Sequence, residues 1–377
     1  MVMSSDTAIV LDNGTGTIKA GFASECAPRV CVPNLIGRPR YFNLFASDPC
    51  IDSILFGSEA LQKRGGMTLS SPMFNGLVFD WDGLTRLWEY IFKQELSIEI
   101  ESRPVLVTET MFNPVQHKET IASIMFEHFN VPSLYVAYQP ILALYASART
   151  SGIVVDCGEG STCITPVYDT YYVRSAACRH NVAGNAVTEY LKRLLPDVGC
   201  RLFTSAEHQI VRDMKEKLCY VATNYQEESL NAANNYHLPV AYELPDGQNV
   251  VLTTERFRAP ELLFSGSLNG YEYFGIHKAI WQCIQDCEPS LRKDMLGNIL
   301  LTGGSTMFRG FMERLRIEMT NLAPSGTPVN VSAPSNRKHT VWLGGSILAS
   351  LEAFQTLWVT RGQYQEYGPD IVNTRCV

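Results

Sequence analysis

The sequence predicts an α/β protein built from two lobes. Helical patterns separate four short apolar runs that are typical of buried strands, at residues 8–11, 104–107, 153–155 and 299–301. Two of these runs end in the same pattern, Asp-x-Gly-x-Gly, within AIVLDNGTG (8–16) and GIVVDCGEG (152–160). A chain of 377 residues is long enough for two or more domains of ~150 residues each. The repeated pattern therefore indicates a duplicated unit with one copy in each half.

Composition and charge exclude several classes of protein. Hydrophobic residues make up 46% and charged residues 18% of the chain, which is typical of globular proteins and not of disordered or coiled-coil ones. The net charge of −7 argues against a nucleic-acid partner, because proteins that bind nucleic acids usually carry a basic excess. The eleven cysteines include no C-x-x-C pair, so we expect free thiols in a reducing compartment and neither a disulfide framework nor a zinc site.

We expect neither a leader nor a membrane segment. The first residues carry no basic region and no long apolar run, so they do not resemble a secretory signal. The most apolar stretch, residues 134–146, is too short to cross a bilayer and contains Gln139. These features predict a cytoplasmic or nuclear protein without a membrane partner.

The order of apolar and polar residues predicts three helices and one surface segment. Apolar residues recur at helical spacing over residues 81–92 and 210–221. Residues 140–145 form a third helix, with Pro140 in the first turn, where a missing N–H is best tolerated. Residues 231–237 (NAANNYH) are polar and rich in turn formers, so we expect a surface excursion there.

The two glycine turns predict hairpins that hold phosphate. A dinucleotide-binding G-x-G-x-x-G would need glycine where Lys19 stands, and the alternating β-branched residues after each turn favour a second strand over a helix. Facing each other across a cleft, two such hairpins would present backbone N–H groups to phosphate oxygens. Thr15 and Ser161 would add hydroxyls, and Asp12 and Asp156 would suit a hydrated Mg²⁺ or Ca²⁺. Two ordinary hairpins without a ligand remain the alternative.

A third glycine turn follows the last apolar run, in ILLTGGST (299–306). We expect it to lead from a strand into a helix that starts at Met307. Together with the two hairpins, it would place backbone atoms and Phe308 against a purine. A tight strand-to-helix connection with no ligand is the alternative.

The chain resembles the actin family from end to end. Long stretches match in the family's order, among them AIVLDNGTGTIKAGFA (8–23), FNVPSLYVAYQPILALYASAR (129–149), GIVVDCGEGST (152–162), LTGGSTMFRGF (301–311) and VWLGGSILASL (341–351). The resemblance implies the α/β fold shared by actin, Hsp70 and sugar kinases, a duplicated fold with two lobes and four subdomains around a nucleotide cleft. It implies a first core lobe (1–34, 72–148 and 340–377) with an outer insertion (35–71), and a second core lobe (149–183 and 273–339) with an outer insertion (184–272).

The resemblance also implies a binding site for ATP or ADP with Mg²⁺ or Ca²⁺. Gln139 would orient the attacking water at the start of a hinge helix, and Asp12 and Asp156 would hold the water shell of the metal. The nucleotide-binding residues it implies are Gly14, Thr15, Gly16, Lys19, Gly158, Glu159 and Gly160 in the two glycine turns, and Gly184, Arg212, Lys215, Glu216, Gly304, Phe308 and Lys338 around the adenosine.

Three kinds of function are compatible with this resemblance. The first is a cytoskeletal ATPase that assembles with itself or with conventional actin, binds actin-binding proteins, and uses slow hydrolysis of ATP to ADP and phosphate as an assembly timer. The second is a non-polymerising actin-related subunit of a larger complex that keeps ATP as a structural ligand. A sugar kinase or chaperone of the same fold is disfavoured, because the chain has no spare residues for a peptide-binding domain and only Glu159 as an unusual cleft acid.

Several residues depart from the usual actin pattern near the predicted phosphates. Glu159 replaces an aspartate, Cys163 and Asn75 each replace a histidine, and Thr15 replaces a serine. The longer side chain of Glu159 could displace its carboxylate or crowd the γ-phosphate, and a thiol is a poor substitute for a histidine that manages protons. We therefore expect ATP binding with altered hydrolysis or phosphate release.

The predicted filament surfaces also depart from the family. The outer loop at residues 41–52 (YFNLFASDPCID) is rich in apolar residues, so it either docks on a neighbouring subunit or folds back on its own lobe. The tip of a second contact segment, Leu268-Asn269, is less apolar than in actins. Only Asp6 precedes the first strand where actins carry an acidic cluster, which argues against myosin binding.

Overall fold

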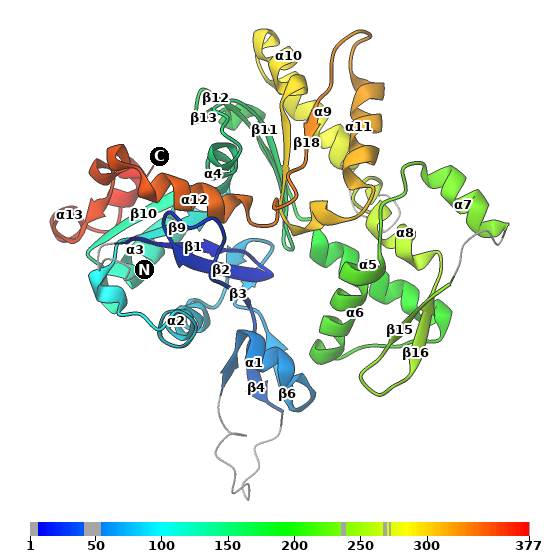
Figure 1. Cartoon of the computed structure of the whole chain (residues 1–377), viewed down its shortest axis with the longest axis horizontal. Helices are drawn as coiled ribbons and strands as arrows, with labels where there is room; N and C mark the ends of the chain where they lie inside the picture. Colours follow the sequence, from blue (N-terminus) through cyan, green and yellow to red (C-terminus); the bar gives the residue numbers. More distant parts are fainter. Residues whose placement is uncertain (1–6, 41–53, 235–238, 267–269, 271–272, 377) are drawn as a thin grey trace, which may run out of the picture. The chain divides into compact units, whose positions relative to one another are not determined.

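The computed structural model describes residues 7–40, 54–234, 239–266, 270 and 273–376. The chain divides into two compact units (Figure 1). Unit 1 comprises Met1–Ser151, Val167–Tyr172 and Asn336–Val377, and unit 2 comprises Gly152–Pro166 and Val173–Ser335. Each unit contains its own sheet with helices packed on it. No helix in the described ranges is long and apolar enough to cross a membrane.

The main sheet of unit 1 runs in the order β19-β10-β9-β1-β2-β3. Its strands are β1 (Ile9–Asn13), β2 (Thr17–Phe22), β3 (Val30–Pro33), β9 (Val105–Glu109), β10 (Ser133–Tyr138) and β19 (Val359–Thr360). β1 pairs antiparallel with β2 and parallel with β9, which is parallel with β10. The apolar runs predicted as strands at 8–11 and 104–107 are confirmed, and the side chains of Ile9, Val10 and Leu11 are fully buried.

Helices cover the main sheet of unit 1. They are α2 (Trp81–Tyr90), α3 (Val115–Ser123), α4 (Gln139–Ala146), α12 (Thr340–Ser350), α13 (Arg361–Tyr367) and α14 (Ile371–Arg375). The side chain of Asp80 caps α2, which a π-helical turn extends, so the predicted helix at 81–92 is confirmed. Pro140 lies in the first turn of α4 as predicted. Gly344 lets α12 pack closely on α4, since a Cβ at this position would collide with the carbonyl oxygen of Leu142.

A smaller sheet, β5-β4-β6, forms an outer part of unit 1. It contains β4 (Ile36–Pro39), β5 (Leu55–Phe56) and β6 (Met67–Ser70), with α1 (Gly57–Gln62) beside it, and β7 (Met73–Phe74) and β8 (Leu77–Val78) form a hairpin nearby in the sequence. This part has a core of its own, made of Leu35, Leu55, Ala60, Met67 and Leu69. The predicted contact loop at 41–52 lies outside the described residues.

The sheet of unit 2 runs in the order β12-β11-β17-β18, with β14 also paired to β12. Its strands are β11 (Gly152–Cys157), β12 (Thr162–Tyr168), β14 (Cys178–His180), β17 (Ile299–Thr302) and β18 (Val331–Ser332). The last two residues of β12, Val167 and Tyr168, form a short hairpin with β13 (Tyr171–Tyr172), and this hairpin belongs to unit 1. β11 and β17 are parallel and buried, so the strands predicted at 153–155 and 299–301 are confirmed.

Seven α-helices and a hairpin complete the described part of unit 2. They are α5 (Gly184–Leu194), α6 (Ser205–Leu218), α7 (Tyr225–Ala233), α8 (Glu255–Glu261), α9 (Ile276–Asp286), α10 (Pro289–Gly297) and α11 (Phe311–Leu322), with the hairpin of β15 (Val240–Glu243) and β16 (Asn249–Leu252). The tip Leu268-Asn269 lies outside the described residues.

Two predicted helices have different limits in the structure. The helix predicted at 210–221 is α6, which ends at Leu218 because Cys219 is extended and the N–H of Val221 donates to the carbonyl oxygen of Arg309 instead. The helix predicted to start at Met307 starts at Phe311. A 3-10 turn, Gly304–Met307, comes first, and Gly310 then takes a φ of 83° before α11 begins.

The surface excursion predicted at 231–237 is only partly correct. Residues 231–233 are the last turn of α7. The start of this helix is stabilised by the cap of Asn224 and by Glu227 and Glu228 in its first turn. Residues 235–238 lie outside the described part of the chain. Polar composition alone thus failed to separate a solvated helix from a turn.

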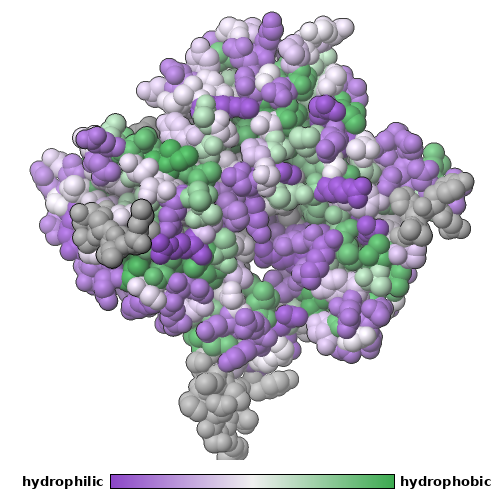
Figure 2. All heavy atoms as spheres, viewed as in Figure 1, coloured by the Kyte–Doolittle hydropathy of each residue, from purple (hydrophilic) through white to green (hydrophobic). Residues whose placement is uncertain are grey.

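The surface mixes polar and apolar residues. On the face shown in Figure 2, green hydrophobic atoms form separate patches among purple and white ones. Phe74 and Phe79, whose rings lie 6.4 Å apart in unit 1, are 53% and 68% exposed. A small exposed apolar pair of this kind is normal for a protein surface.

Candidate functional site

The first glycine turn closes a hairpin between β1 and β2, as the sequence predicted. The side-chain amide of Asn34 donates to the carbonyl oxygen of Gly14 at 3.0 Å, and the backbone N–H of Asn34 donates to the carbonyl oxygen of Gly16 at 3.3 Å. A Cβ at Gly14 would lie 2.6 Å from the carbonyl oxygen of Thr17, so a side chain there would force the turn to change. Asn34 therefore fixes the turn, and no side chain at Gly14 or Gly16 covers its backbone.

Asp12 is the centre of a buried polar network in unit 1. Its carboxylate is 2% exposed, and Oδ2 accepts a hydrogen bond from Nζ of Lys19 at 2.6 Å. Oδ1 accepts from Oγ1 of Thr108 at 2.6 Å and from Nε2 of Gln139 at 3.4 Å. Oε1 of Gln139 accepts in turn from Oγ1 of Thr110 at 3.1 Å. Three predicted site residues, Asp12, Lys19 and Gln139, thus lie in one network.

The sequence reasoning missed Thr108 and Thr110. Both follow the apolar run at 104–107, and β9 is parallel to β1, so the carboxyl ends of the two strands meet at one edge of the sheet. The sequence did offer one signal for these residues, namely two apolar runs that each end in polar residues and that could pair in parallel. Thr108 lies 96 residues along the chain from Asp12, a separation that local patterns do not reveal.

Thr15 contacts a second turn of unit 1. Its Oγ1 accepts a hydrogen bond from the backbone N–H of Gly76 at 2.9 Å, and the side-chain amide of Asn113 donates to the carbonyl oxygen of Gly76 at 3.2 Å. Asn75 has a φ of 48°, a left-handed conformation that asparagine tolerates better than most residues. The Thr15 hydroxyl thus keeps its own proton available for another acceptor.

Lys338 and its neighbour His339 complete the candidate residues of unit 1. Burial, followed by the positive charges of Lys19 and Lys338, lowers the pKa of His339, so both lysines lie near this imidazole. The buried Nδ1 atom of His339 has no hydrogen-bond partner within the described ranges. An orphaned ring nitrogen next to Lys338 is an observation in favour of a polar ligand at this point.

The second glycine turn closes the predicted hairpin between β11 and β12, with the N–H of Gly158 donating to the carbonyl oxygen of Ser161 at 3.1 Å. Asp156 lies near the end of β11, opposite Thr302 of β17. Gly303 follows β17 with a φ of 89°, and a Cβ there would lie 2.5 Å from Oδ1 of Asp156. The third glycine turn thus passes directly against this carboxylate.

Glu159 pairs with two basic residues of α6. Its carboxylate lies 3.2 Å from Nζ of Lys215 and 3.9 Å from Nε of Arg212. Burial opposes ionisation of this carboxyl group, but the charges of Lys215 and Arg212 outweigh it and lower the pKa of Glu159. Nζ of Lys215 also donates to the carbonyl oxygen of Gly184 at 2.9 Å. The carboxylate of Glu159 therefore points toward α6.

The remaining candidates of unit 2 surround this ion pair. Arg212 donates to Glu216 at 3.0 Å, and the hydroxyl of Ser305 donates to the carbonyl oxygen of Gly158 at 2.6 Å. A Cβ at Gly304 would meet no atom within 4 Å, so the backbone there faces open space. Phe308 packs partly buried against the core of the unit. The structure thus brings Gly158, Glu159, Gly184, Arg212, Lys215 and Glu216 together, with Gly304 next to Ser305.

Cys163 is a neutral buried thiol. Burial, assisted by the charge of Asp156, raises its pKa to about 12. The thiol therefore neither accepts nor releases a proton near neutral pH, in agreement with its expected weakness as a replacement for histidine.

No group of three or more His, Cys, Asp or Glu side chains in the described ranges could hold a metal ion directly. Asp12 already accepts hydrogen bonds on both carboxylate oxygens. A divalent cation that uses these residues would have to keep waters of its own, as Mg²⁺ commonly does.

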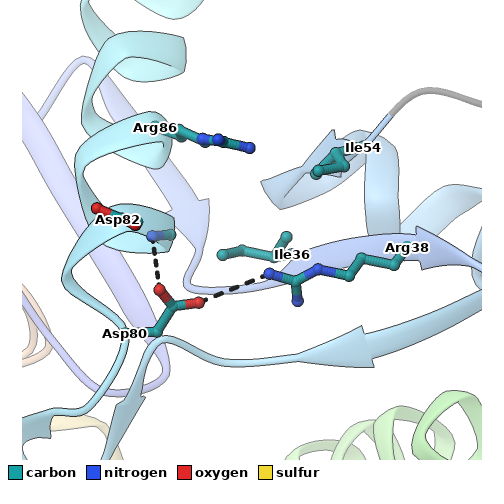
Figure 3. A pocket seen from close by; sticks show the side chains of 7 residues that line it. Ile36, Arg38, Ile54, Asp80, Asp82 and Arg86 are labelled. Carbon is teal, nitrogen blue, oxygen red and sulfur yellow. Dashed lines mark hydrogen bonds and ion pairs between the residues drawn. The ribbon is translucent and has the colours of Figure 1, made fainter.

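A pocket of about 190 Å³ in unit 1 lies apart from all these residues. Figure 3 shows that its walls come from β4, the start of α2 and Ile54, with Asp80 between them. Oδ1 of Asp80 accepts from the N–H of Gly83 at 2.8 Å, and Oδ2 lies 3.6 Å from Arg38. Asp80 thus caps α2 and contacts Arg38 of the outer sheet. None of the predicted site residues lines this pocket.

A comparison with known families agrees with the resemblance. A sequence model of the family described as "Actin" matches residues 3–377, nearly the whole chain. The mixed α/β fold with several sheets that the resemblance implied is likewise confirmed. The chain therefore belongs to the actin family.

Proposed function

We propose that this protein binds ATP or ADP with a divalent cation and acts as a cytoskeletal, filament-associated ATPase with slow turnover. Actin-family proteins generally bind a nucleotide and a divalent cation. The observation that carries the proposal is the buried network of Asp12, Lys19 and Gln139 beside a bare glycine turn. Each unit would contribute one glycine hairpin to the phosphates and its own acid, Asp12 or Asp156.

The residues of unit 1 fit a phosphate ligand. Lys19 supplies a positive charge that now pairs with the carboxylate of Asp12. A phosphate oxygen would replace this carboxylate or bind Lys19 together with it. The bare turn from Gly14 to Gly16 would let N–H groups approach the oxygens closely. The amide of Gln139 is held at both ends, by Asp12 and Thr110, and a fixed amide suits the orientation of one water molecule.

The cation would be held through water. A hydrated Mg²⁺ or Ca²⁺ supplies positive charge that neutralises the phosphate oxygens during phosphoryl transfer. Asp12 and Asp156 would accept hydrogen bonds from its waters, which agrees with the absence of a direct ligand cluster in the described ranges. Asp12 meets this requirement because it is buried, ionisable and oriented by Thr108.

The resemblance implies slow turnover, and the residue at position 163 would slow it further. A neutral thiol does not relay the proton of an attacking water, so hydrolysis would depend on positioning by Gln139 and on the charges around the phosphate. The four-part division of the chain, the adenosine contacts of Lys215, Glu216 and Phe308, and a location in the cytoskeleton belong to the same proposal.

A second function is favoured by Glu159 and Cys163. If turnover is abolished, ATP would act as a structural ligand of an actin-related subunit in a larger complex. The ion pair of Glu159 with Lys215 would then stabilise the adenosine side of unit 2 without contributing to chemistry.

Two measurements test these functions. Binding of a fluorescent ATP analogue to the full chain with Mg²⁺ should weaken at least tenfold in Lys19→Ala, because a charge-assisted contact is lost. Lys217→Ala, which removes an exposed lysine paired with Asp213, should bind as the unchanged protein does. Circular dichroism checks that each variant is folded, and equal binding by both variants would refute the nucleotide site.

High-speed sedimentation in Mg-ATP, followed by electron microscopy, then separates the two functions. Helical filaments in the pellet would support the filament-associated ATPase. A soluble protein that retains ATP would support the complex subunit.

A further inference from the structure

Three cysteines of unit 2 lie at one end of α9. Cys178 belongs to β14, and Cys283 and Cys287 lie at the end of α9 and just after it. Sγ of Cys283 donates a hydrogen bond to Sγ of Cys178 at 3.1 Å. Sγ of Cys287 donates instead to the backbone carbonyl oxygen of Cys283 at 3.2 Å. Two of the three thiols therefore face each other, and the third faces the helix backbone.

The two facing thiols differ in chemical character. The hydrogen bond from Cys283 lowers the pKa of Cys178, although burial opposes this, and a hydrogen bond to His180 acts in the same direction. The same hydrogen bond raises the pKa of Cys283, and burial raises it further. The hydrogen bond thus favours ionisation of Cys178 over that of Cys283, and the thiolate is the nucleophilic form of cysteine.

Rigid elements hold both sulfurs in place. β14 pairs antiparallel with β12, where Cys178 is opposite the buried Ile164. α9 is anchored in the core of unit 2 by Ile280 and Ile284, both fully buried. A disulfide has a sulfur–sulfur bond of about 2.05 Å, so the two atoms must approach by only about 1 Å. Cys178 is partly exposed and Cys283 is 2% exposed, so a small reagent reaches Cys178 first.

We propose that Cys178 and Cys283 form a reversible disulfide, a redox modification site that crosslinks β14 to α9. The co-reactant is a low-molecular-weight disulfide of the glutathione type. The Cys178 thiolate attacks one sulfur of this disulfide, forming a mixed disulfide and releasing one glutathione thiolate. Cys283 gives its proton to that thiolate and attacks the sulfur of Cys178, which releases the second glutathione thiolate. Two protein sulfurs are oxidised, and one glutathione disulfide is reduced to two glutathione molecules.

Cys178 is the attacking residue and Cys283 the resolving residue of this pair. The crosslink would join residues 105 positions apart in the sequence. Closing a loop of that length restricts the unfolded chain, so the oxidised protein should unfold at a higher temperature than the reduced one. The inference does not depend on nucleotide binding.

The experiment is disulfide mapping of the full chain. The protein is equilibrated in glutathione buffers of increasing oxidised fraction, quenched with acid, alkylated and digested for mass spectrometry. We expect one crosslinked peptide pair, containing Cys178 and Cys283, which dithiothreitol removes. The variant C287S should give the same crosslink. A crosslink that includes Cys287, or no crosslink in fully oxidised glutathione, would overturn the proposal.

A second comparison separates the attacking from the resolving residue. In C283S the hydroxyl still donates a hydrogen bond to Cys178, so Cys178 should accumulate a stable mixed disulfide with glutathione. In C283A that donor is lost, and alkylation of Cys178 by iodoacetamide at pH 7 should slow several-fold relative to C283S. Equal alkylation rates in the two variants would show that Cys283 does not activate Cys178.

The unchanged protein provides a test that does not require folding of a variant. Its partly buried Cys178 should be alkylated at pH 7 at least as fast as the exposed Cys26. Slower alkylation of Cys178 than of Cys26 would contradict the assignment of Cys178 as the attacking residue.

Discussion

The two glycine hairpins start from the same sequence pattern and reach different electrostatic solutions. In unit 1 the strand-end acid, Asp12, pairs with Lys19 of the adjacent strand, only seven residues away. In unit 2 the acid within the turn, Glu159, pairs with Lys215 from α6, 56 residues away. In the first hairpin the partner of the acid lies within the hairpin, and in the second it lies on helix α6, outside the hairpin. The two hairpins share the pattern Asp-x-Gly-x-Gly but differ in where the basic partners of their acids come from.

The largest expected effect is on the pair of Asp12 and Lys19 in the first hairpin. Asp12→Asn leaves the charge of Lys19 without a carboxylate in a buried site, and removing one partner of such a pair costs about 3 kcal/mol or more. We expect the urea midpoint of the nucleotide-free protein to fall accordingly, and ATP to restore part of the loss because its phosphates would compensate Lys19. The double variant Asp12→Asn/Lys19→Met is the control and should be more stable than Asp12→Asn alone. A single variant as stable as the unchanged protein would contradict the pairing.

A smaller effect is expected in the second hairpin, because its charges have additional partners. Glu159→Gln leaves Lys215 bound to the carbonyl oxygen of Gly184 and Arg212 bound to Glu216, so we expect a loss of about 2 kcal/mol near pH 7. The control is Glu216→Gln, which changes a half-exposed partner of Arg212 and should cost less than about 1 kcal/mol. Equal losses in the two variants would show that Lys215 does not depend on Glu159.

The pH dependence of that loss has a definite sign. The pKa of Glu159 is lowered in the folded protein from its ordinary value of 4.5. Its stabilising contribution is therefore fully present above about pH 4.5 and is lost as the pH falls through the lower, folded value. The difference in unfolding free energy between the unchanged protein and Glu159→Gln should be constant from pH 6 to 8 and shrink below pH 4.5. A difference that grows on acidification would contradict the ion pair.

A third comparison concerns chemistry at the second hairpin. Cys163→His replaces a neutral thiol by a group that exchanges protons near pH 7, so single-turnover hydrolysis of ATP with Mg²⁺ should rise roughly tenfold. Cys163→Asn, a substitution of similar size without a base, controls for the strain of a larger side chain in a buried position. Equal rates for the histidine variant and the unchanged protein would show that position 163 does not limit turnover.

Local patterns predicted the parts of the fold whose cause is local. The apolar runs of β1, β9, β11 and β17, and the hairpins after two of them, follow from adjacent residues alone. The end of α6 at Leu218 depends on the pairing of Val221 with Arg309, and the late start of α11 depends on a 3-10 turn. Thr108 and Gln139, which bond to Asp12, and Lys215, which bonds to Glu159, likewise come from distant segments. Contacts between remote elements determine these features, and a single sequence does not display them.

The smallest expected effect tests how Asp12 is oriented. Thr108→Val keeps the shape of the side chain and removes the hydrogen bond to Oδ1, which should cost about 1–2 kcal/mol because the acceptor is charged. Thr110→Val is the matched control, since it removes a bond to Gln139 and leaves the bond between Thr108 and Asp12 in place. If nucleotide binding weakens in the first variant and only hydrolysis slows in the second, Asp12 acts in binding and Gln139 in chemistry. Identical effects of the two substitutions would mean that Asp12 and Gln139 act together. The separation of binding by Asp12 from chemistry by Gln139 would then be wrong.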